Sequence, residues 1–306
     1  MIELPQTRGV VMNKPALTEQ SNPASAEIDR METLEIVTVI NNEDHKIAVA
    51  VKKVLPDIAR AVDLITASLS KGGRMAYFGA VTSGRIAFLD AADCPSTFGI
   101  SPQQIQAFIA GGDLSLKTAL DGVEDSAALA EADINNFNPQ PGDIVVSLSA
   151  SGNPQYGVSI LELARARGAK TIGISSNPDA RLKPFADIFI NPLLGEEVIS
   201  GSSRMKSATA QKMILNMLST ATMVRLGKTY RNLMVDVEIS NQKLYRRACD
   251  IIVKITGVGN ATAEDFLRQS QNRVKTACVM AAKNCSLSQA EELLQKAGGR
   301  LRSIIG

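Results

Sequence analysis

The chain of 306 residues has no tryptophan, and its aromatic residues amount to only 4%. Stacking platforms for nucleobases use aromatic side chains, so this scarcity argues against a nucleic-acid-binding surface. The formal net charge of +2 gives no strong attraction to nucleic acid or to an anionic membrane. The sequence also has no secretory signal pattern and no apolar run of about 18 residues, the length that a membrane span needs. We therefore expect a cytoplasmic protein with neither nucleic acid nor a membrane as partner.

Histidine occurs once, as His45, within a polar run over residues 41–46. A single imidazole nearly excludes a Ser-His-Asp triad and a His-ligated metal, so acid–base chemistry must use carboxylates, lysines or tyrosines. The four cysteines are widely spaced and show no pairing typical of a metal site. We expect them to be reduced and mostly buried, and we expect no metal.

Strand and helix patterns alternate through the first two thirds of the chain. Apolar runs predict strands near 75–79, 105–109, 143–148, 170–175 and 187–191, with helical segments between them. This alternation is typical of a parallel sheet covered by helices on both faces, a three-layer α/β fold. We predict an extended N-terminal arm over 1–25, an α/β domain over 26–238 and an all-helical C-terminal subdomain over 239–306.

Helical periodicity marks several longer segments. Apolar residues recur at helical spacing from Ile47 to Leu69, where Pro56 should bend or divide the helix. A long helix is predicted from Ser203 to Leu226, with apolar residues around more of its circumference than one core needs, so we predict a homodimer. The C-terminal helices are predicted at Gln242–Thr256, Thr262–Lys283 and Ser288–Ile304.

Two of the predicted strands end in loops of small and hydroxyl-bearing residues. Thr82-Ser83-Gly84 follows the first strand, Ser149-Ala150-Ser151-Gly152 follows a later one, and each loop precedes a helix. The first amides of a helix lack backbone partners and carry partial positive charge, so they can hold a phosphate together with the hydroxyls. Ligands of parallel sheets bind at the carboxyl ends of strands, where both loops should meet. Helix capping alone would also explain these hydroxyls.

The two loops resemble those of the sugar isomerase (SIS) domain, in which hydroxyls at strand ends hold a sugar phosphate. Further motifs resemble a narrower family, over residues 17–304. They are Leu17-Thr18-Glu19, Asn22-Pro23-Ala24-Ser25, Asp93-Cys94-Pro95-Ser96-Thr97-Phe98-Gly99, Gly122-Val123-Glu124-Asp125, Gly201-Ser202-Ser203-Arg204-Met205-Lys206 and Asn232-Leu233-Met234-Val235-Asp236-Val237. With these motifs the chain resembles the N-acetylmuramic acid 6-phosphate etherases. Glucokinase regulatory protein shares parts of the pattern.

This resemblance implies an SIS-type fold and a lyase that needs no cofactor and serves cell-wall recycling. Such an enzyme cleaves the D-lactyl ether of a phosphorylated amino sugar, N-acetylmuramic acid 6-phosphate, by elimination and hydration. The products are N-acetylglucosamine 6-phosphate and D-lactate. The resemblance places the catalytic carboxylates at Asp93 and Glu124, adds Ser203 and Lys206 to the substrate-binding residues, and implies that a second subunit completes each site.

The sequence departs from the family pattern at three places near the expected site. Asp93 stands where the family usually has Glu, Val81 replaces a Gly, and Asn153-Pro154-Gln155 replaces a segment that carries Arg and Thr. Two alternatives therefore stay open: a sugar-phosphate-binding regulator without catalysis, and a divergent paralog that acts on another hexosamine phosphate. An aldose–ketose isomerase is less favoured, because the etherase motifs are present.

Overall fold

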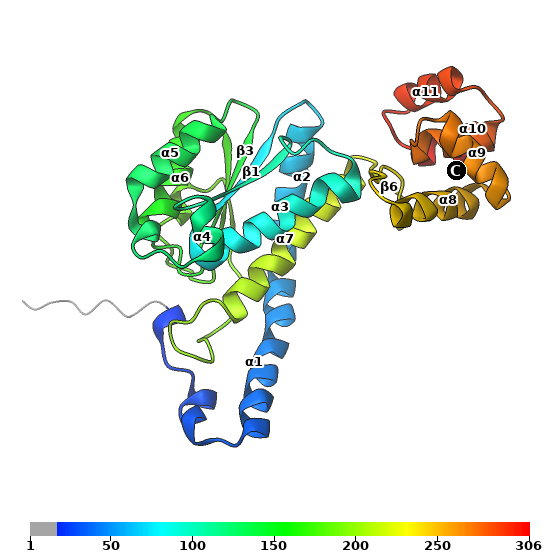
Figure 1. Ribbon diagram of the computed structural model, residues 1–306. Coiled ribbons are helices and arrows are strands. Elements are labelled where there is room, and N and C mark those ends of the chain that lie inside the picture. The colour runs from blue at the N-terminus through cyan, green and yellow to red at the C-terminus, as the bar shows by residue number, and fades with distance from the viewer. Residues whose placement is uncertain (1–16) are drawn as a thin grey trace, which may run out of the picture.

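The computed structural model describes residues 17–306, and at its centre lies a five-stranded parallel sheet in the order β2-β1-β3-β4-β5 (Figure 1). The α/β fold class and all five predicted strands are confirmed. The strands are Met75–Gly79 (β1), Ile105–Ile109 (β2), Ile144–Leu148 (β3), Lys170–Ile174 (β4) and Ile188–Ile190 (β5).

Helices cover both faces of this sheet, so alternate residues of a strand enter two different cores. Tyr77 of β1 packs into the first core, whereas its neighbour Phe78 packs into the second. The first core also takes in α1 (Thr33–Lys53), α2 (Leu55–Leu69), α3 (Val81–Phe98) and α7 (Lys206–Arg225). The second takes in α5 (Ala127–Phe137) and α6 (Gln155–Ala166). Burial on both faces explains why β1 and the first three residues of β3 are apolar without alternation.

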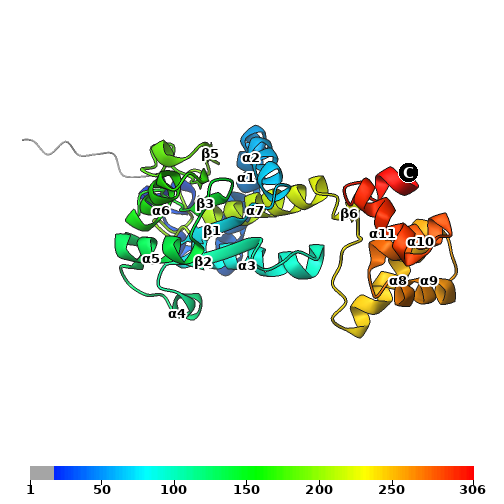
Figure 2. The same cartoon turned by 90° about the horizontal axis from the view of Figure 1, so that it is seen from above.

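The strand order creates a crevice at the carboxyl edge of the sheet. The chain passes from β1 outward to β2 and then returns to β3 on the other side of β1. The helices that follow β1 and β3 therefore lie on opposite faces, α3 on one and α6 on the other (Figure 2). Parallel α/β sheets bind ligands at such a switch point.

The N-terminal part is more ordered than the sequence suggested. The predicted extended arm is wrong over Leu17–Ser25, where two short 3₁₀-helices, Leu17–Glu19 and Pro23–Ser25, pack against the segment before α7. Asn22 Nδ2 donates to Glu196 O at 3.2 Å and Ser25 Oγ donates to Val198 O at 2.6 Å, and these long-range bonds hold the segment. The rest of the predicted arm, residues 1–16, lies outside the described residues.

The helix predicted from Ile47 is divided at Pro56, as expected, since α1 ends at Lys53 and α2 begins at Leu55. However, α1 begins at Thr33, after a third 3₁₀-helix, Ile28–Arg30. The side chains of Glu32 and Glu35 form a capping box there, which favours the early start.

The C-terminal subdomain is helical and has a core of its own. Its helices are α8 (Gln242–Thr256), α9 (Asn260–Gln269), α10 (Val274–Lys283), α11 (Leu287–Lys296) and α12 (Arg302–Ile305). Two predicted helices proved to be interrupted. Left-handed backbone at Gln271 and Asn272 separates α9 from α10, and Gly298 and Gly299 end the last predicted helix early. A short hairpin, Thr229–Tyr230 (β6) with Leu233–Met234 (β7), precedes them and was not predicted.

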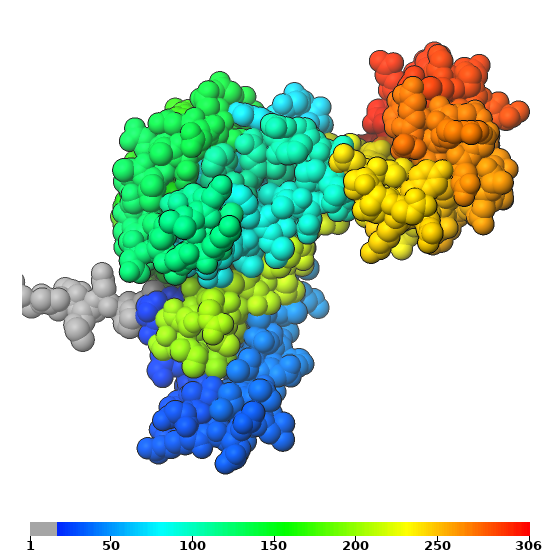
Figure 3. Space-filling view, in the orientation of Figure 1, coloured from blue at the N-terminus to red at the C-terminus, as the bar shows by residue number. Residues whose placement is uncertain are grey.

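The C-terminal subdomain forms a separate lobe beside the α/β body (Figure 3). Both α3 and α7 run from the carboxyl edge of the sheet toward this lobe (Figure 1). Lys275 Nζ fastens the lobe at the far ends of these helices, through Asp236 Oδ2 at 2.6 Å and Gly227 O at 3.0 Å. Within residues 17–306, no helix combines the length and the apolar character that crossing a membrane requires.

Candidate functional site

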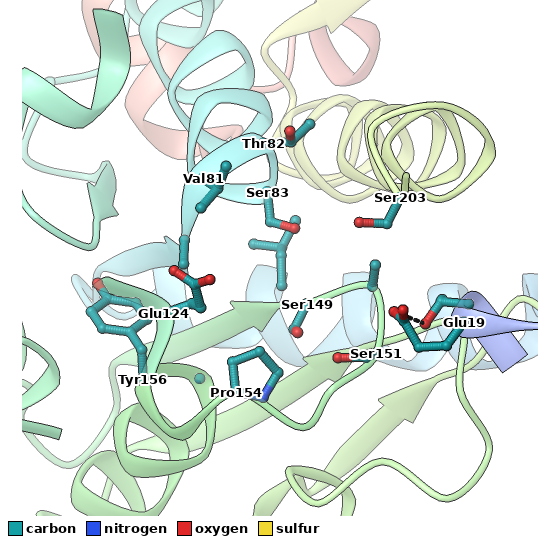
Figure 4. Close-up of a pocket in the computed structure, with 15 residues that line it drawn as sticks. Glu19, Val81, Thr82, Ser83, Glu124, Ser149, Ser151, Pro154, Tyr156 and Ser203 are labelled. Carbon is teal, nitrogen blue, oxygen red and sulfur yellow. Dashed lines mark hydrogen bonds between the residues drawn. The ribbon is translucent and has the colours of Figure 1, made fainter. Parts of the chain in front are cut away.

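A cavity of about 320 Å³ lies in the crevice at the carboxyl ends of β1 and β3 (Figure 4). Four further segments contribute to its walls: the Leu17–Glu19 helix, the 3₁₀-helix Val123–Asp125, the first turn of α6 and the residues just before α7. The polar lining residues are Thr18, Glu19, Thr82, Ser83, Glu124, Ser149, Ser151, Tyr156 and Ser203. Neither Lys nor Arg lines the cavity among the residues that the structure describes.

The first wall is the start of α3. The amides of Val81, Thr82 and Ser83 precede the first hydrogen bond of the helix, in which Gly84 N–H donates to Ala80 O at 3.3 Å. These three amides and the hydroxyls of Thr82 and Ser83 have the chemistry to donate hydrogen bonds to an anion, as free amides at a helix N-terminus do. Gly84 is buried behind it rather than in the cavity lining, and an added Cβ would lie 2.4 Å from Ile109 Cγ1. Gly84 thus allows α3 to pack closely against β2.

The second wall is the loop between β3 and α6. Ser149 Oγ accepts a hydrogen bond from Gly152 N at 3.1 Å, and Ser151 Oγ accepts one from Asn153 N at 3.4 Å. Because both oxygens act as acceptors, each hydroxyl proton is free to be donated to an anion. Gly152 lies behind the loop with φ +66°, and an added Cβ would lie 2.4 Å from Ala180 Cβ. Only glycine meets both the conformational and the steric requirement.

Glu124 points into the cavity from the side of α6 (Figure 4). Its Oε2 atom is buried and has no hydrogen-bond partner among residues 17–306. Leaving a buried acceptor unpaired costs free energy, so native proteins keep few such atoms. A carboxylate kept in this state at the edge of a cavity is a strong candidate for contact with a ligand or a reacting proton.

Tyr156 lines the same side of the cavity as Glu124, and the sequence had not singled it out. Its hydroxyl donates to Asp133 Oδ2 at 2.7 Å, away from the cavity. Burial raises the pKa of the Tyr156 phenol, and the neighbouring Asp133 raises it further. Tyr156 is therefore a neutral wall residue at neutral pH.

Two predicted site residues lie away from this cavity. Asp93 is exposed on α3, twelve residues beyond Val81. At 1.5 Å per residue that separation is about 18 Å along the helix. Lys206 is only 1% exposed, and its Nζ donates to Glu43 Oε2 at 2.6 Å and to Leu194 O at 3.0 Å. The ammonium is thus occupied inside the protein.

The buried charges around Lys206 support the wall that carries Ser203. The Glu197 carboxylate accepts from the backbone N–H groups of Lys206 and Ser207, at 2.9 Å each, and so caps α7. Burial alone would raise the pKa of Glu43, but hydrogen bonds from Lys206, Lys46 and Asn22 outweigh it and lower the pKa to about 2. Glu43 is therefore ionised near neutral pH and pairs with the Lys206 ammonium.

The sequence missed the contribution of Thr18 and Glu19 to the cavity. Both belong to the quoted motif Leu17-Thr18-Glu19, which was the available signal. Their position in the cavity could not be predicted from the sequence, because they lie far from the other motifs along the chain. Only tertiary packing brings the segment to the loop before α7.

Comparison with known proteins gives three family matches. Residues 57–165 match the glucokinase regulatory protein N-terminal SIS domain, and residues 126–221 match the SIS domain. Residues 231–275 match the C-terminal lid domain of glucokinase regulatory protein.

Several curated relatives are similar along nearly the whole chain. The N-acetylmuramic acid 6-phosphate etherase of Escherichia coli O139:H28 is 46% identical over 289 residues, which cover 94% of this chain and 97% of the relative. The enzyme of the same name from Shigella boydii serotype 18 matches with the same identity and coverage. Among solved structures, an Escherichia coli CFT073 protein in complex with A5P is 18% identical. It covers 71% of this chain and 100% of its own, with a TM-score of 0.50, and shows a shared fold.

Proposed function

The chain belongs to the N-acetylmuramic acid 6-phosphate etherase family, and on that premise we propose that the cavity at β1 and β3 binds and cleaves this sugar phosphate. The chain is a carbon–oxygen lyase, and its reaction gives N-acetylglucosamine 6-phosphate and D-lactate. Identity of 46% over 94% of the chain supports this activity over a non-catalytic regulator or a paralog with another hexosamine phosphate.

The phosphate is held where α3 and α6 begin. Ser83 and Ser151 each donate a hydroxyl there, and Thr82, Ser149 and Ser203 supply further donors. No Lys or Arg belongs to the described lining, so the helix-terminal amides and hydroxyls must balance the phosphate charge.

Glu124 acts on the carbon 2 proton of the open-chain sugar. The aldehyde at carbon 1 acidifies that proton, and its removal lets the carbon 3–oxygen bond break, so that D-lactate leaves. Water then adds to carbon 3 of the enal and a proton returns to carbon 2, which completes the exchange of lactate for hydroxyl. The buried, unpartnered Oε2 of Glu124 in the cavity is the observation that supports this role.

Asp93 protonates the departing lactate oxygen from a second copy of the chain. Along α3, Asp93 lies about 18 Å from the cavity of its own chain. A homodimer is therefore required to bring the Asp93 carboxyl group to the cavity of the second copy. Two uncovered apolar surfaces support such a dimer. An open groove between α2 and α7 is lined mainly by apolar residues, and Leu89, one turn before Asp93 on α3, is 49% exposed.

The free thiols of the buried residues Cys94, Cys249 and Cys278 fit a reducing compartment, and we place the enzyme in the cytoplasm. N-acetylmuramic acid is a sugar of the bacterial cell wall, so the role of the enzyme is in the recycling of wall fragments.

The direct test is an assay of D-lactate release from N-acetylmuramic acid 6-phosphate. The parent protein should release lactate, and Glu124→Gln should abolish release, because the amide has the same shape but is not a base. Asp125→Asn is the matched control: Asp125 lies in the same 3₁₀-helix, is exposed and does not line the cavity. Equal loss in both variants would indicate a general effect on folding, and full activity of Glu124→Gln would remove Glu124 from the mechanism.

A further inference from the structure

We propose that Glu19 is a substrate-binding residue of this cavity that accepts hydrogen bonds from sugar hydroxyls. The inference rests on the proposed function, because it assigns a role within the same cavity. Glu19 and Glu124 lie at opposite ends of the cavity, with Ser83, Ser149 and Ser151 between them (Figure 4).

The backbone around Glu19 is fastened to the loop that carries Ser203. Gly201 N–H donates to Thr18 O at 2.9 Å, and Ser200 Oγ donates to Glu19 O at 3.0 Å. Thr18 is itself buried, and its Oγ1 donates to Glu19 Oε1 at 3.3 Å. These bonds fix the backbone position of Glu19, and its exposed side chain is accessible to a ligand in the cavity.

The backbone of Gly201 lies close to the Glu19 carboxylate. Gly201 has φ +76°, and an added Cβ there would lie only 3.0 Å from Glu19 Oε2. A Cβ at position 201 would therefore push the Glu19 carboxylate aside by a few tenths of an ångström.

The chemistry of the cavity restricts what Glu19 can bind. Glu19 forms no ion pair within residues 17–306, and neither Lys nor Arg lines the cavity in that range. An ionised carboxylate only accepts hydrogen bonds, and phosphate oxygens at neutral pH are mainly acceptors as well. Sugar hydroxyls can donate to it. Glu19 therefore recognises the hydroxyl-bearing carbons of the sugar and repels anions that lack them.

Calorimetric measurement of binding with two anions separates the recognition of sugar hydroxyls from the repulsion of phosphate. N-acetylglucosamine 6-phosphate carries hydroxyls and a phosphate, whereas inorganic phosphate has no sugar hydroxyls. Glu19→Gln should weaken binding of the sugar phosphate about tenfold or more, as expected for loss of a hydrogen bond to a charged group. It should leave inorganic phosphate binding equal or tighter. Glu27→Gln, at an exposed glutamate that pairs with Arg30, should change neither.

A second pair of variants tests the same contact through the backbone. Gly201→Ala and Gly195→Ala both introduce a Cβ at positive φ, +76° and +70°, so both carry similar conformational strain. An added Cβ at Gly195 meets no atom within 4 Å, whereas one at Gly201 meets Glu19. Gly201→Ala should therefore weaken sugar phosphate binding several-fold more than Gly195→Ala.

Two results would overturn the proposal. Parent-like binding of both anions by Glu19→Gln would remove Glu19 from the site, and equal weakening for both anions would reduce it to a structural role. The proposed lyase activity is judged separately, by D-lactate release from the parent protein. A parent that releases lactate while Glu19→Gln binds normally would refute only the assignment of Glu19.

Discussion

Val81 occupies a backbone conformation that its side chain disfavours. We predict that the Val81→Gly variant is more stable than the Val81→Ala variant, and the sign of this difference tests whether the strain exists. Val81 has φ +49° at the start of α3, beside the backbone amides that line the cavity. A side chain in the left-handed region costs about 1–2 kcal/mol, because Cβ crowds the following carbonyl oxygen. Glycine avoids this cost.

The magnitude follows from comparing Val81→Ala with Val81→Gly. Both variants lose the branched methyl groups that pack partly against the second core, so that loss cancels in the comparison. Alanine keeps Cβ and hence the strain, whereas glycine relieves about 1–2 kcal/mol. Glycine in turn costs about 0.5–1 kcal/mol of extra chain entropy. Val81→Gly should therefore be more stable than Val81→Ala by about 0.5–1 kcal/mol.

Urea unfolding of both variants, at one protein concentration, measures this difference. An exposed position inside the same helix supplies the control: Ala92 has ordinary helical backbone, so Ala92→Gly should lower the unfolding free energy by about 0.5–1 kcal/mol. Opposite signs at the two positions of α3 are the expected pattern. If Val81→Gly proves less stable than Val81→Ala, the strain at the start of α3 does not exist.

Three further predictions concern the phosphate loop and the buried charges. Ser83→Ala should weaken binding of N-acetylglucosamine 6-phosphate by about 1.5–3 kcal/mol, and unchanged affinity by calorimetry would exclude the first loop from the phosphate site. Lys206→Met should lower the unfolding free energy by about 3–5 kcal/mol, because the buried Glu43 carboxylate loses its partner. Adding Glu43→Leu should restore part of that loss, and additive losses in urea unfolding would refute the pairing. The folded-state pKa of Glu43 is about 2, below the ordinary 4.5. The contribution of Glu43 to the unfolding free energy is therefore complete above pH 4.5 and should decline as the pH falls toward 2. The Glu43→Gln variant should lack this decline.

The sheet and the two hydroxyl-bearing loops at its edge could be predicted because their signals are local. Each parallel strand is a short apolar run between turn residues, and each loop is a hydroxyl-rich segment between a strand and a helix. Ser83 and Ser151 meet in one cavity because neighbouring parallel strands end at the same edge. The left-handed turn at Gln271 and Asn272 has no comparable signal, so the break between α9 and α10 was missed.

The site residues that were missed, or that were predicted but lie away from the cavity, depend on contacts between distant segments. Lys206 has the sequence context of a binding residue, yet α1 supplies Glu43 as its buried partner, 163 positions away along the chain. Glu19 enters the cavity only because the Leu17–Glu19 helix packs against the loop before α7. Asp93 lies far along α3 from the cavity. A sequence motif cannot show whether such a residue acts in its own chain or in a second copy.

The central claim is that the cavity performs elimination followed by hydration, and one measurement tests it most directly. The parent protein is incubated with N-acetylmuramic acid 6-phosphate in deuterated water, and D-lactate is quantified together with deuterium on the sugar product. The account predicts one deuterium at carbon 2 of N-acetylglucosamine 6-phosphate for each D-lactate released, because the proton that Glu124 removes is replaced from solvent. Lactate released with the original hydrogen still at carbon 2 would contradict the elimination, and the absence of both lactate and deuterium would contradict the lyase itself.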